Sequence, residues 1–195
     1  MTRSRLPRSF YARDAKTVAQ DLLGRLIVST VDGSRCVARV VETEAYLGPH
    51  DPASHAAGGR RTARNEVMYG APGRAYVYFT YGMHWCFNVV TDRAGFPGAV
   101  LIRAAEPLEG LDVMRRRRGA LADRLLAAGP ARLAQALGIA RDHNGHALTH
   151  APLWLADAEP VPARRRVSSP RVGIREAVDW PLRFYEKGSE FVSRA

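Results

Sequence analysis

The stretch Val41–Pro49 reads VETEAYLGP, and the stretch Arg74–Asn88 reads RAYVYFTYGMHWCFN. The first predicts the end of a β-strand, where a period of two places Glu42 and Glu44 on one face. The second carries four tyrosine or tryptophan rings within ten residues and predicts a β-hairpin that turns at residues 81–83. These stretches decide the fold, because they predict an antiparallel sheet with carboxylates within reach of flat aromatic faces.

The remaining sequence predicts an α+β fold, a single domain over residues 1–195 with an antiparallel β-sheet and peripheral helices. A chain of 195 residues suits one domain, and a composition that is 46% hydrophobic supplies an ordinary core. Residues 1–13 are expected to form a flexible basic arm. An N-cap at Asp14 predicts the first helix, which Gly24 would end. The further predicted elements are strands Arg25–Val31 and Arg35–Ala45 with a two-residue turn at Asp32–Gly33, strand Ala99–Ala105, and helices Gly110–Gly119, Ala120–Ala128 and Ala131–Leu137.

The charge of the chain favours a nucleic-acid partner. The formal net charge is +10, and 27 of the 29 basic residues are arginine, whose planar side chain pairs with phosphate and stacks on bases. The alternative is that arginine richness reflects genomic base composition and sets only solubility. No apolar run of about 18 residues predicts a membrane span, and the N-terminus lacks the apolar core of a secretory signal. We therefore expect a DNA-bound protein of the cytoplasm or nucleoid that is not secreted.

The sequence predicts neither a metal site nor a cofactor. Cys36 and Cys86 are the only cysteines, and both read as buried, reduced thiols in strands. His143, His146 and His150 lie in a polar loop, without the Cys/His signature of the zinc deaminases. No phosphate-binding loop or dinucleotide-binding glycine pattern occurs.

The carboxylates and the rings each have two interpretations. Glu42 and Glu44 could be solvated residues at a strand end, or one of them could be a general base; the sequence does not decide which would hold a water. Tyr76 and Tyr78 share one strand face and could pack in the core or line a pocket. Tyr81, at the hairpin turn, could be a packed aromatic or a wedge between base pairs.

Several arginines are candidates for contacts with the DNA backbone. The long connection Gly48–Gly73 is rich in glycine and proline, and a long ordered loop is usually functional. Arg103 lies inside an apolar strand and therefore needs a partner or a site. Arg115–Arg118 reads by default as a solvated helix face, whereas Arg171, near Arg164–Arg166, is favoured for the backbone. The side chains of this loop that indicate a function near an anion are His55, Arg60, Arg61 and Arg64.

Seven motifs, in order along nearly the whole chain, carry a resemblance to a known family. They are VETEAYLGPHDPASHA, GGRRTARN, PGRAYVYFTYGMHWCFN, AVLIRAAEPLEG, GPARLAQALGI, SSPRVGI and PLRFYEKGSEFVS. The chain resembles the alkyladenine (3-methyladenine) DNA glycosylases of the mammalian type. The resemblance implies a monomer that needs no protein partner or cofactor and carries a DNA-intercalating hairpin. It would excise alkylated or deaminated purines of the 3-methyladenine, 7-methylguanine, hypoxanthine and ethenoadenine class from double-stranded DNA.

The resemblance also implies roles for individual residues. Glu44 would be the catalytic carboxylate and Arg103 would lie near the catalytic water. Tyr46 and His55 would stack on one side of the base and Tyr78 on the other. The asparagine that helps to exclude guanine would be Asn88, and the intercalating residue would be Tyr81.

The lysine content bears on the type of glycosylase. A lyase reaction needs an amine nucleophile, and neither Lys16 nor Lys187 lies in the central motifs, so we expect a monofunctional enzyme. Two other functions stay open, namely a damaged-base sensor without chemistry and an RNA-binding accessory domain. The presence of Glu44, Arg103 and Asn88 weighs against both.

Overall fold

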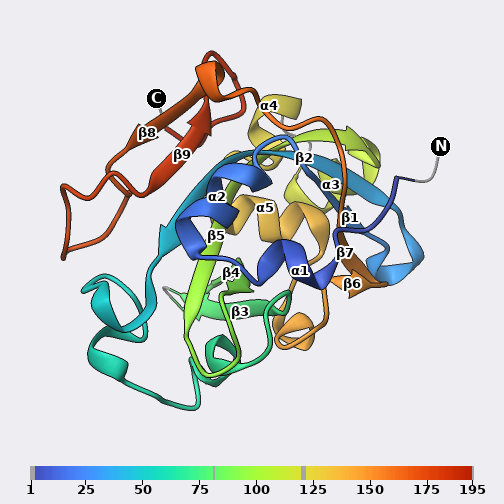
Figure 1. Ribbon diagram of the computed structural model, residues 1–195. Helices are drawn as coiled ribbons and strands as arrows, with labels where there is room; N and C mark the ends of the chain where they lie inside the picture. Colours follow the sequence, from blue (N-terminus) through green and yellow to red (C-terminus); the bar gives the residue numbers. More distant parts are fainter. Residues whose placement is uncertain (1–2, 81, 120–121, 195) are drawn as a thin grey trace.

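The computed structural model describes residues 3–80, 82–119 and 122–194. Within these residues, the strands form one antiparallel sheet in the order β3-β4-β5-β2-β1-β7-β6, and β9 pairs with both β2 and β8 (Figure 1). The strands are β1 (Leu26–Ser29), β2 (Cys36–Tyr46), β3 (Ala75–Thr80), β4 (His84–Thr91), β5 (Gly98–Glu109), β6 (Thr149–His150), β7 (Leu153–Ala156), β8 (Arg166–Ser169) and β9 (Arg183–Glu186).

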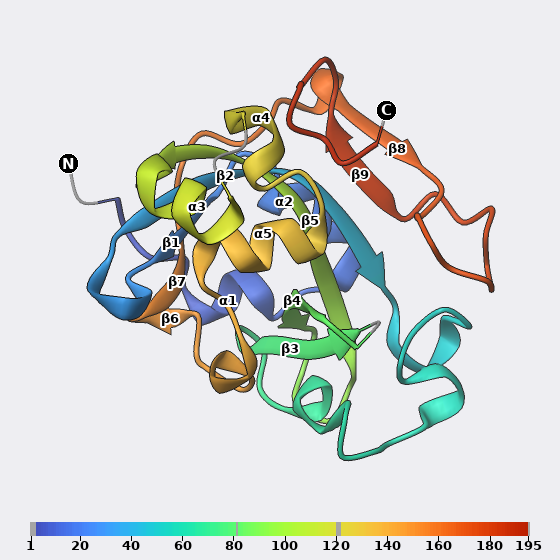
Figure 2. The same ribbon diagram turned by 180° about the vertical axis from the view of Figure 1, so that it is seen from behind.

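Two helices lie at the centre of the molecule rather than at its periphery. Leu22 of α2 and Leu133 of α5 belong to the same buried cluster as Ile27 of β1 and Phe87 of β4. Because β1 and β4 are three strands apart, the sheet must curl around these helices, and Figure 2 shows α5 in the middle of the fold. The α+β prediction is confirmed, and the helices are α1 (Arg8–Tyr11), α2 (Ala15–Leu22), α3 (Leu111–Arg118), α4 (Asp123–Leu126) and α5 (Pro130–Leu137).

The first long helix, α2, begins and ends as the sequence predicts. The side chain of Asp14 accepts a hydrogen bond from the backbone N–H of Thr17 (2.9 Å), which satisfies one of the free donors of the first turn. Gly24 follows the helix with φ +91°, and a Cβ there would lie 2.4 Å from the Glu159 carbonyl oxygen. The buried face of α2 consists of Ala15, Val18, Ala19 and Leu22.

The N-terminal segment differs from the predicted flexible arm. Arg5 forms a β-bridge with Ala156, and the backbone N–H of Leu6 donates to the Leu155 carbonyl (2.9 Å). Leu6 and Tyr11 are buried. Residues 3–13 therefore pack on the sheet, because they contribute apolar side chains to the core.

The first hairpin is confirmed, but its loop is longer than predicted. Ser29 pairs with Cys36, so residues 30–35 connect the strands, and Val31–Gly33 forms a 3-10 turn. The Val31 carbonyl accepts a bond from Arg117 of α3 (3.2 Å), which holds the wider loop. The strand Ala99–Ala105 is also longer than predicted, since β5 continues to Glu109.

The second hairpin joins β3 to β4 as predicted. Its turn residue Tyr81 lies outside the residues that the structure describes. Of its neighbours, Phe79 (44%) and Met83 (69%) are exposed, and the Phe79 ring packs on Trp85 at 4.7 Å between centroids.

The central strands present two different faces. Inward residues such as Val77 and Val100 join the main core around α2 and α5. Outward residues such as Tyr76 and Ala99 join a second, smaller cluster with Met68 of the long loop. The outward face is therefore covered by the connection between β2 and β3, and the candidate site lies there.

Candidate active site

Four paired side chains form a row across the outward face of the sheet. Tyr76 of β3 pairs with Asn88 of β4, Asn88 pairs with Leu101 of β5, and Leu101 pairs with Glu44 of β2. All four are buried. Because paired residues lie side by side, the row brings an aromatic ring, an amide and a carboxylate together on rigid strands.

A cavity of about 480 Å³ opens over this row. That volume falls within the roughly 300–1,000 Å³ of typical small-molecule sites. The strands form its floor, and the loop after β2 and residues 172–176 form its sides. The sequence-predicted residues that line it are Tyr46, His55, Arg64, Tyr78, Asn88 and Arg103.

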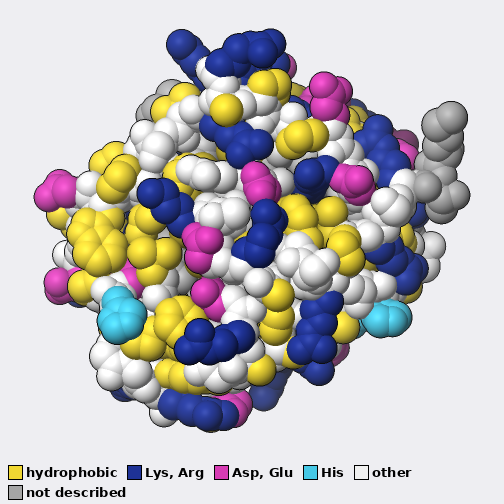
Figure 3. Space-filling view, viewed as in Figure 1, with side chains coloured by type: hydrophobic (Ala, Val, Ile, Leu, Met, Phe, Trp, Pro, Cys, Tyr) yellow, Lys and Arg dark blue, Asp and Glu magenta, His cyan; other side chains and the backbone are white. Residues whose placement is uncertain are grey.

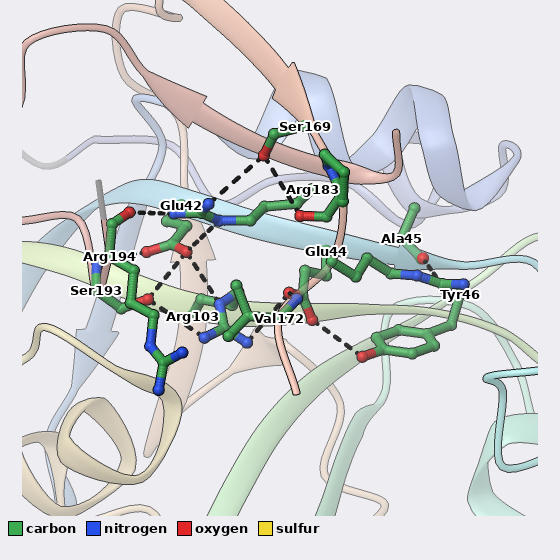
Figure 4. Close-up of polar contacts among 12 residues, drawn as sticks. Glu42, Glu44, Ala45, Tyr46, Arg103, Ser169, Val172, Arg183, Ser193 and Arg194 are labelled. Atoms are coloured by element: carbon green, nitrogen blue, oxygen red, sulfur yellow. Dashed lines mark hydrogen bonds and ion pairs between the residues drawn. The ribbon is translucent and has the colours of Figure 1, made fainter. Parts of the chain in front are cut away.

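Glu44 lies behind the cavity wall with its side chain fully buried. Its Oε1 accepts a hydrogen bond from the backbone N–H of Val172 (2.7 Å) and forms an ion pair with Arg103 Nη1 (3.1 Å), and its Oε2 accepts a hydrogen bond from the Tyr46 hydroxyl (2.9 Å) (Figure 4). All three donors belong to residues that line the cavity. Since a carboxylate offers about four acceptor sites, Glu44 keeps one of them, on Oε2.

Glu42 differs from Glu44 in its surroundings, because two of its three partner residues lie away from the cavity. Its Oε1 accepts from Arg103 Nε (2.9 Å), Arg183 Nε (2.7 Å) and Ser193 Oγ (3.0 Å). Its Oε2 accepts from the backbone N–H of Ser193 (2.6 Å). The two carboxylates that the sequence left equivalent are therefore distinct in their surroundings, since every partner of Glu44 lines the cavity, whereas Arg183 and Ser193 do not.

Arg103 connects the two carboxylates. Its Nε faces Glu42 and its Nη1 faces Glu44, and its side chain is 7% exposed. Arg103, a charged residue inside an apolar strand, is therefore paired with two buried glutamates. With Arg183, the group contains two cations and two anions, which limits the cost of burying charge.

The aromatic wall differs from the arrangement implied by the resemblance. The rings of His55 and Tyr78 lie edge to face with centroids 4.6 Å apart, and His55 Nδ1 bonds the Tyr76 hydroxyl (2.8 Å). A base stacked between two rings needs roughly 7 Å, twice the optimal carbon–carbon separation. No base fits between His55 and Tyr78, so these two rings form one wall instead of opposite walls.

The environment keeps the aromatic residues in their neutral forms. Burial, and then the charge of Glu44, raises the pKa of Tyr46 well above its usual value, so its hydroxyl stays protonated and donates. Burial raises the pKa of Tyr76 to about 12. His55 is exposed at the cavity, yet partial desolvation of its imidazole and then the charge of Arg64 lower its pKa to about 4. The imidazole is therefore neutral at neutral pH.

The three loop arginines predicted to contact DNA are on the surface. Arg60, Arg61 and Arg64 are exposed. The Arg61 side chain pairs with exposed Glu66 (2.5 Å), and the Arg64 guanidinium lies 5.2 Å from the centre of the Tyr78 ring, at the cavity. All three stay candidates for phosphate contact.

Arg171 does not fit the predicted contact with the DNA backbone. Its side chain is 0% exposed, and its guanidinium pairs with the equally buried carboxylate of Asp51. Because a phosphate cannot reach a guanidinium enclosed by protein, the prediction for Arg171 is wrong.

On the face shown in Figure 3, basic side chains are spread out rather than gathered in one patch. Figure 3 shows arginines and lysines scattered over one face, with acidic and apolar side chains between them. The quadruple-arginine run on α3 is tied into the protein, since Arg115 pairs with Asp112 and Asp123, and Arg117 donates to backbone carbonyls. This run is therefore largely structural.

Sequence reasoning missed four residues, three of which bind the two carboxylates. Ser193 and Arg183 bind Glu42, Val172 binds Glu44, and Asp51 binds Arg171. The first three approach β2 from segments more than 125 positions away. Pattern and spacing carry no signal for such distant contacts.

The histidines and cysteines have ordinary structural surroundings. Within the described part of the chain, no three His, Cys, Asp or Glu side chains gather closely enough to hold a metal ion. His146 Nε2 bonds the carbonyls of His150 (3.0 Å) and Leu153 (2.9 Å). Cys36 and Cys86 are buried free thiols, and burial raises the pKa of each. Among the described residues, no helix is both long and apolar enough to cross a lipid bilayer.

Comparisons with known proteins agree over almost the whole chain. Residues 9–190 match the family model described as "Methylpurine-DNA glycosylase (MPG)". A protein of Carboxydothermus hydrogenoformans is 50% identical over 190 residues, which cover 97% of this chain and 98% of that protein. Proteins of Desulfitobacterium hafniense (46% over 200 residues, 97% and 98% coverage) and Methanoculleus marisnigri (50% over 192 residues, 97% and 98% coverage) are also similar. All three are named "Putative 3-methyladenine DNA glycosylase".

Proposed function

The chain belongs to the methylpurine-DNA glycosylase family, and from this membership we propose that the cavity binds a damaged purine flipped out of duplex DNA while Glu44 directs the attacking water. As a 3-methyladenine DNA glycosylase, it hydrolyses N-glycosyl bonds in the base excision repair of alkylated purines. The observation that carries the mechanism is the buried carboxylate of Glu44, which has one free acceptor site behind an aromatic cavity.

The base stacks between Tyr46 on one side and the joined rings of His55 and Tyr78 on the other. A purine has two flat faces, and each stacked ring contributes roughly 1–3 kcal/mol. A cationic 3-alkyl or 7-alkyl purine also gains about 0.5–2 kcal/mol from cation–π attraction. Asn88, on the floor, donates to the Tyr76 carbonyl (3.0 Å). We assign to Asn88 the exclusion of guanine, whose 2-amino group would meet the Asn88 side chain.

Hydrolysis proceeds through one water. Glu44 accepts a proton from this water while the water oxygen bonds to C1′ and the N-glycosidic bond breaks, with its electron pair leaving on the purine. The Val172 N–H and Arg103 hold the carboxylate in place, and the negative charge of Glu44 stabilises the positive charge that develops on the sugar. Glu42 is not assigned this role, because it accepts four hydrogen bonds and two of its partner residues, Arg183 and Ser193, lie away from the cavity.

The enzyme is monofunctional and leaves the abasic site uncut. Lys16 and Lys187 are exposed and neither lines the cavity. No Schiff base with the sugar can then form from a lysine at the site. Trapping with borohydride is expected to leave no covalent enzyme–DNA product.

DNA binding relies on the loop arginines and on the hairpin. We assign Tyr81 to the gap left by the flipped nucleotide, supported by its position between exposed Phe79 and Met83. Exposed Arg60, Arg61 and Arg64 contact the DNA phosphates. The protein acts as a monomer, with one molecule at each lesion. Flipping costs a few kcal/mol and costs least for weakly paired bases, which favours damaged sites.

Single-turnover base release tests this proposal. The substrates are duplexes with one hypoxanthine or with alkylated purines, and the enzymes are wild type, Glu44→Gln and Glu176→Gln. Glu176 is a matched control, since it is an exposed carboxylate on the cavity rim. We expect release by wild type and by Glu176→Gln, and none by Glu44→Gln, with the affinity for DNA retained in all three.

Other outcomes contradict parts of the proposal. Release by Glu44→Gln at the wild-type rate would exclude Glu44 as the base. Tight binding of lesions by wild type without any release would favour a damaged-base sensor. Release of alkylated purines alone would restrict the enzyme to activated, cationic leaving groups.

A further inference from the structure

Arg171 and Asp51 form a buried ion pair that the mechanism above does not use. Arg171 donates from Nη1 to Asp51 Oδ2 (2.5 Å) and from Nη2 to Oδ1 (2.8 Å), which is a bidentate contact. Both side chains are 0% exposed. Burial of two charges is costly and is seldom the best route to stability, so the pair calls for a reason beyond packing.

The pair joins separate segments of the cavity wall. Asp51 also accepts hydrogen bonds from the backbone N–H groups of Leu47 (3.1 Å) and Ala53 (3.0 Å), so all four of its acceptor sites are used. Arg171 also donates to the carbonyl of Ala45 in β2 (3.0 Å). The loop that leads to His55 is thereby fixed against the end of β2 and against the segment that begins at Arg171.

Arg171 touches one of the rings proposed to stack on the base. Its guanidinium carbon lies 4.7 Å from the centre of the Tyr46 ring, within the range of a cation–π contact. The ring face under Arg171 is covered, so only its other face can stack on a purine. The Tyr46 hydroxyl is held in turn by Glu44 (2.9 Å).

Arg171 also fixes a donor to the catalytic carboxylate. The next residue, Val172, donates its backbone N–H to Glu44 Oε1 at 2.7 Å. A backbone N–H follows the position of the peptide that carries it, and the side chain of Arg171 is bound at three acceptor atoms. Displacement of Arg171 would therefore shift both the ring and the N–H.

We propose that Arg171, held by Asp51, is a positioning residue that reserves one face of Tyr46 for the flipped purine and directs the Val172 N–H at Glu44. The inference rests on the proposed function and deepens it. It predicts a loss in the rate of base release with little change in the affinity for undamaged DNA, because neither residue is exposed to a phosphate.

The test uses two altered forms of the pair and one control. Arg171→Met removes the cation, and the double variant Asp51→Asn with Arg171→Gln removes both charges while keeping a similar volume. The control, Arg39→Met, removes an arginine of β2 that pairs with Glu106 (3.1 Å) and Glu186 (2.6 Å) and does not line the cavity. It removes a partly buried arginine from its ion pairs without touching Tyr46.

Two readouts separate positioning from folding. Single-turnover release of hypoxanthine is expected to slow about 100-fold in both Arg171 variants, as for a misplacement of roughly 1 Å at a reacting group. The fluorescence of an ethenoadenine base in DNA reports its stacking on the protein without any chemistry, and it should differ from wild type. Arg39→Met should keep the wild-type rate and fluorescence, with thermal unfolding measured for every variant.

The proposal fails if the Arg171 variants match Arg39→Met in rate and in fluorescence. If Arg171→Met does not fold, the double variant Asp51→Asn with Arg171→Gln is compared with Arg39→Met in rate and in fluorescence instead. A wild-type protein that releases no base would instead contradict the proposed function, and the fluorescence comparison would still test the positioning of Tyr46.

Discussion

Replacement of Glu42 by glutamine is expected to destabilise the protein strongly. Glu42 binds Arg103 and Arg183, whose side chains are each 7% exposed, at 2.9 and 2.7 Å. Glutamine would remove the negative charge while leaving both cations buried. Arg103 would keep Glu44 as a partner, but the remaining bonds of Arg183 go to the Ser169 hydroxyl and the Arg194 carbonyl, which carry no charge.

The magnitude follows from the two charged contacts. Each hydrogen bond to a charged group contributes roughly 1.5–3 kcal/mol, and breaking a buried ion pair by removing one partner costs about 3–5 kcal/mol. We expect Glu42→Gln to lower the free energy of unfolding by about 3–5 kcal/mol. For a domain of this size, that corresponds to a Tm decrease of roughly 6–20 °C.

The assay is urea denaturation combined with thermal unfolding. Glu176→Gln, an exposed carboxylate to amide change, should shift stability by less than about 0.5 kcal/mol. The double variant Glu42→Gln with Arg183→Met should lose less than the sum of the single changes, because it no longer leaves Arg183 buried and unpaired. The reasoning would be refuted by a Glu42→Gln loss below about 1 kcal/mol, or by strictly additive losses.

Three further predictions concern single sites. Tyr11→Phe should leave stability unchanged or raise it by about 1 kcal/mol in urea denaturation, because the Tyr11 hydroxyl is buried without a partner among the described residues. Since the pKa of His55 is lowered from 6.5 to about 4, the unfolded chain binds this proton more readily between those values. Stability should therefore fall as the pH drops through that window, and His55→Gln should reduce the difference between denaturation at pH 5 and pH 7.5. Gly24→Ala should cost about 1–3 kcal/mol by thermal unfolding, because φ is +91° and the added Cβ would meet the Glu159 carbonyl at 2.4 Å.

Local features of the fold could be predicted, because their causes lie within a few residues. The cap at Asp14, the β3–β4 hairpin and helix α5 after Gly129 follow from side-chain chemistry and spacing. The period of two correctly placed Tyr76 and Tyr78 on one face of β3, since both line the cavity.

Long-range features could not be predicted in the same way. The pairing of β9 with β2 brings Arg183 to Glu42 across 141 positions, and nothing in the local sequence marks the contact. Spacing also could not show that His55 lies against Tyr78, because the loop between β2 and β3 sets its position. Arg171 was misassigned for a related reason, since its partner Asp51 lies 120 positions earlier.

The contact of Arg183 with Glu42 also has a consequence for the order of events during synthesis. A ribosome adds about 5–20 residues per second, so the 141 positions between these residues correspond to roughly 7–28 s of translation. Arg103 follows Glu42 after 61 positions, so in the later part of that interval the nascent chain carries Glu42, Glu44 and Arg103 without the second arginine that balances their charge. A chain stalled before β9 therefore lacks one of the two cations that balance Glu42 and Glu44, and the proposed active site is complete only after the last sheet pairing.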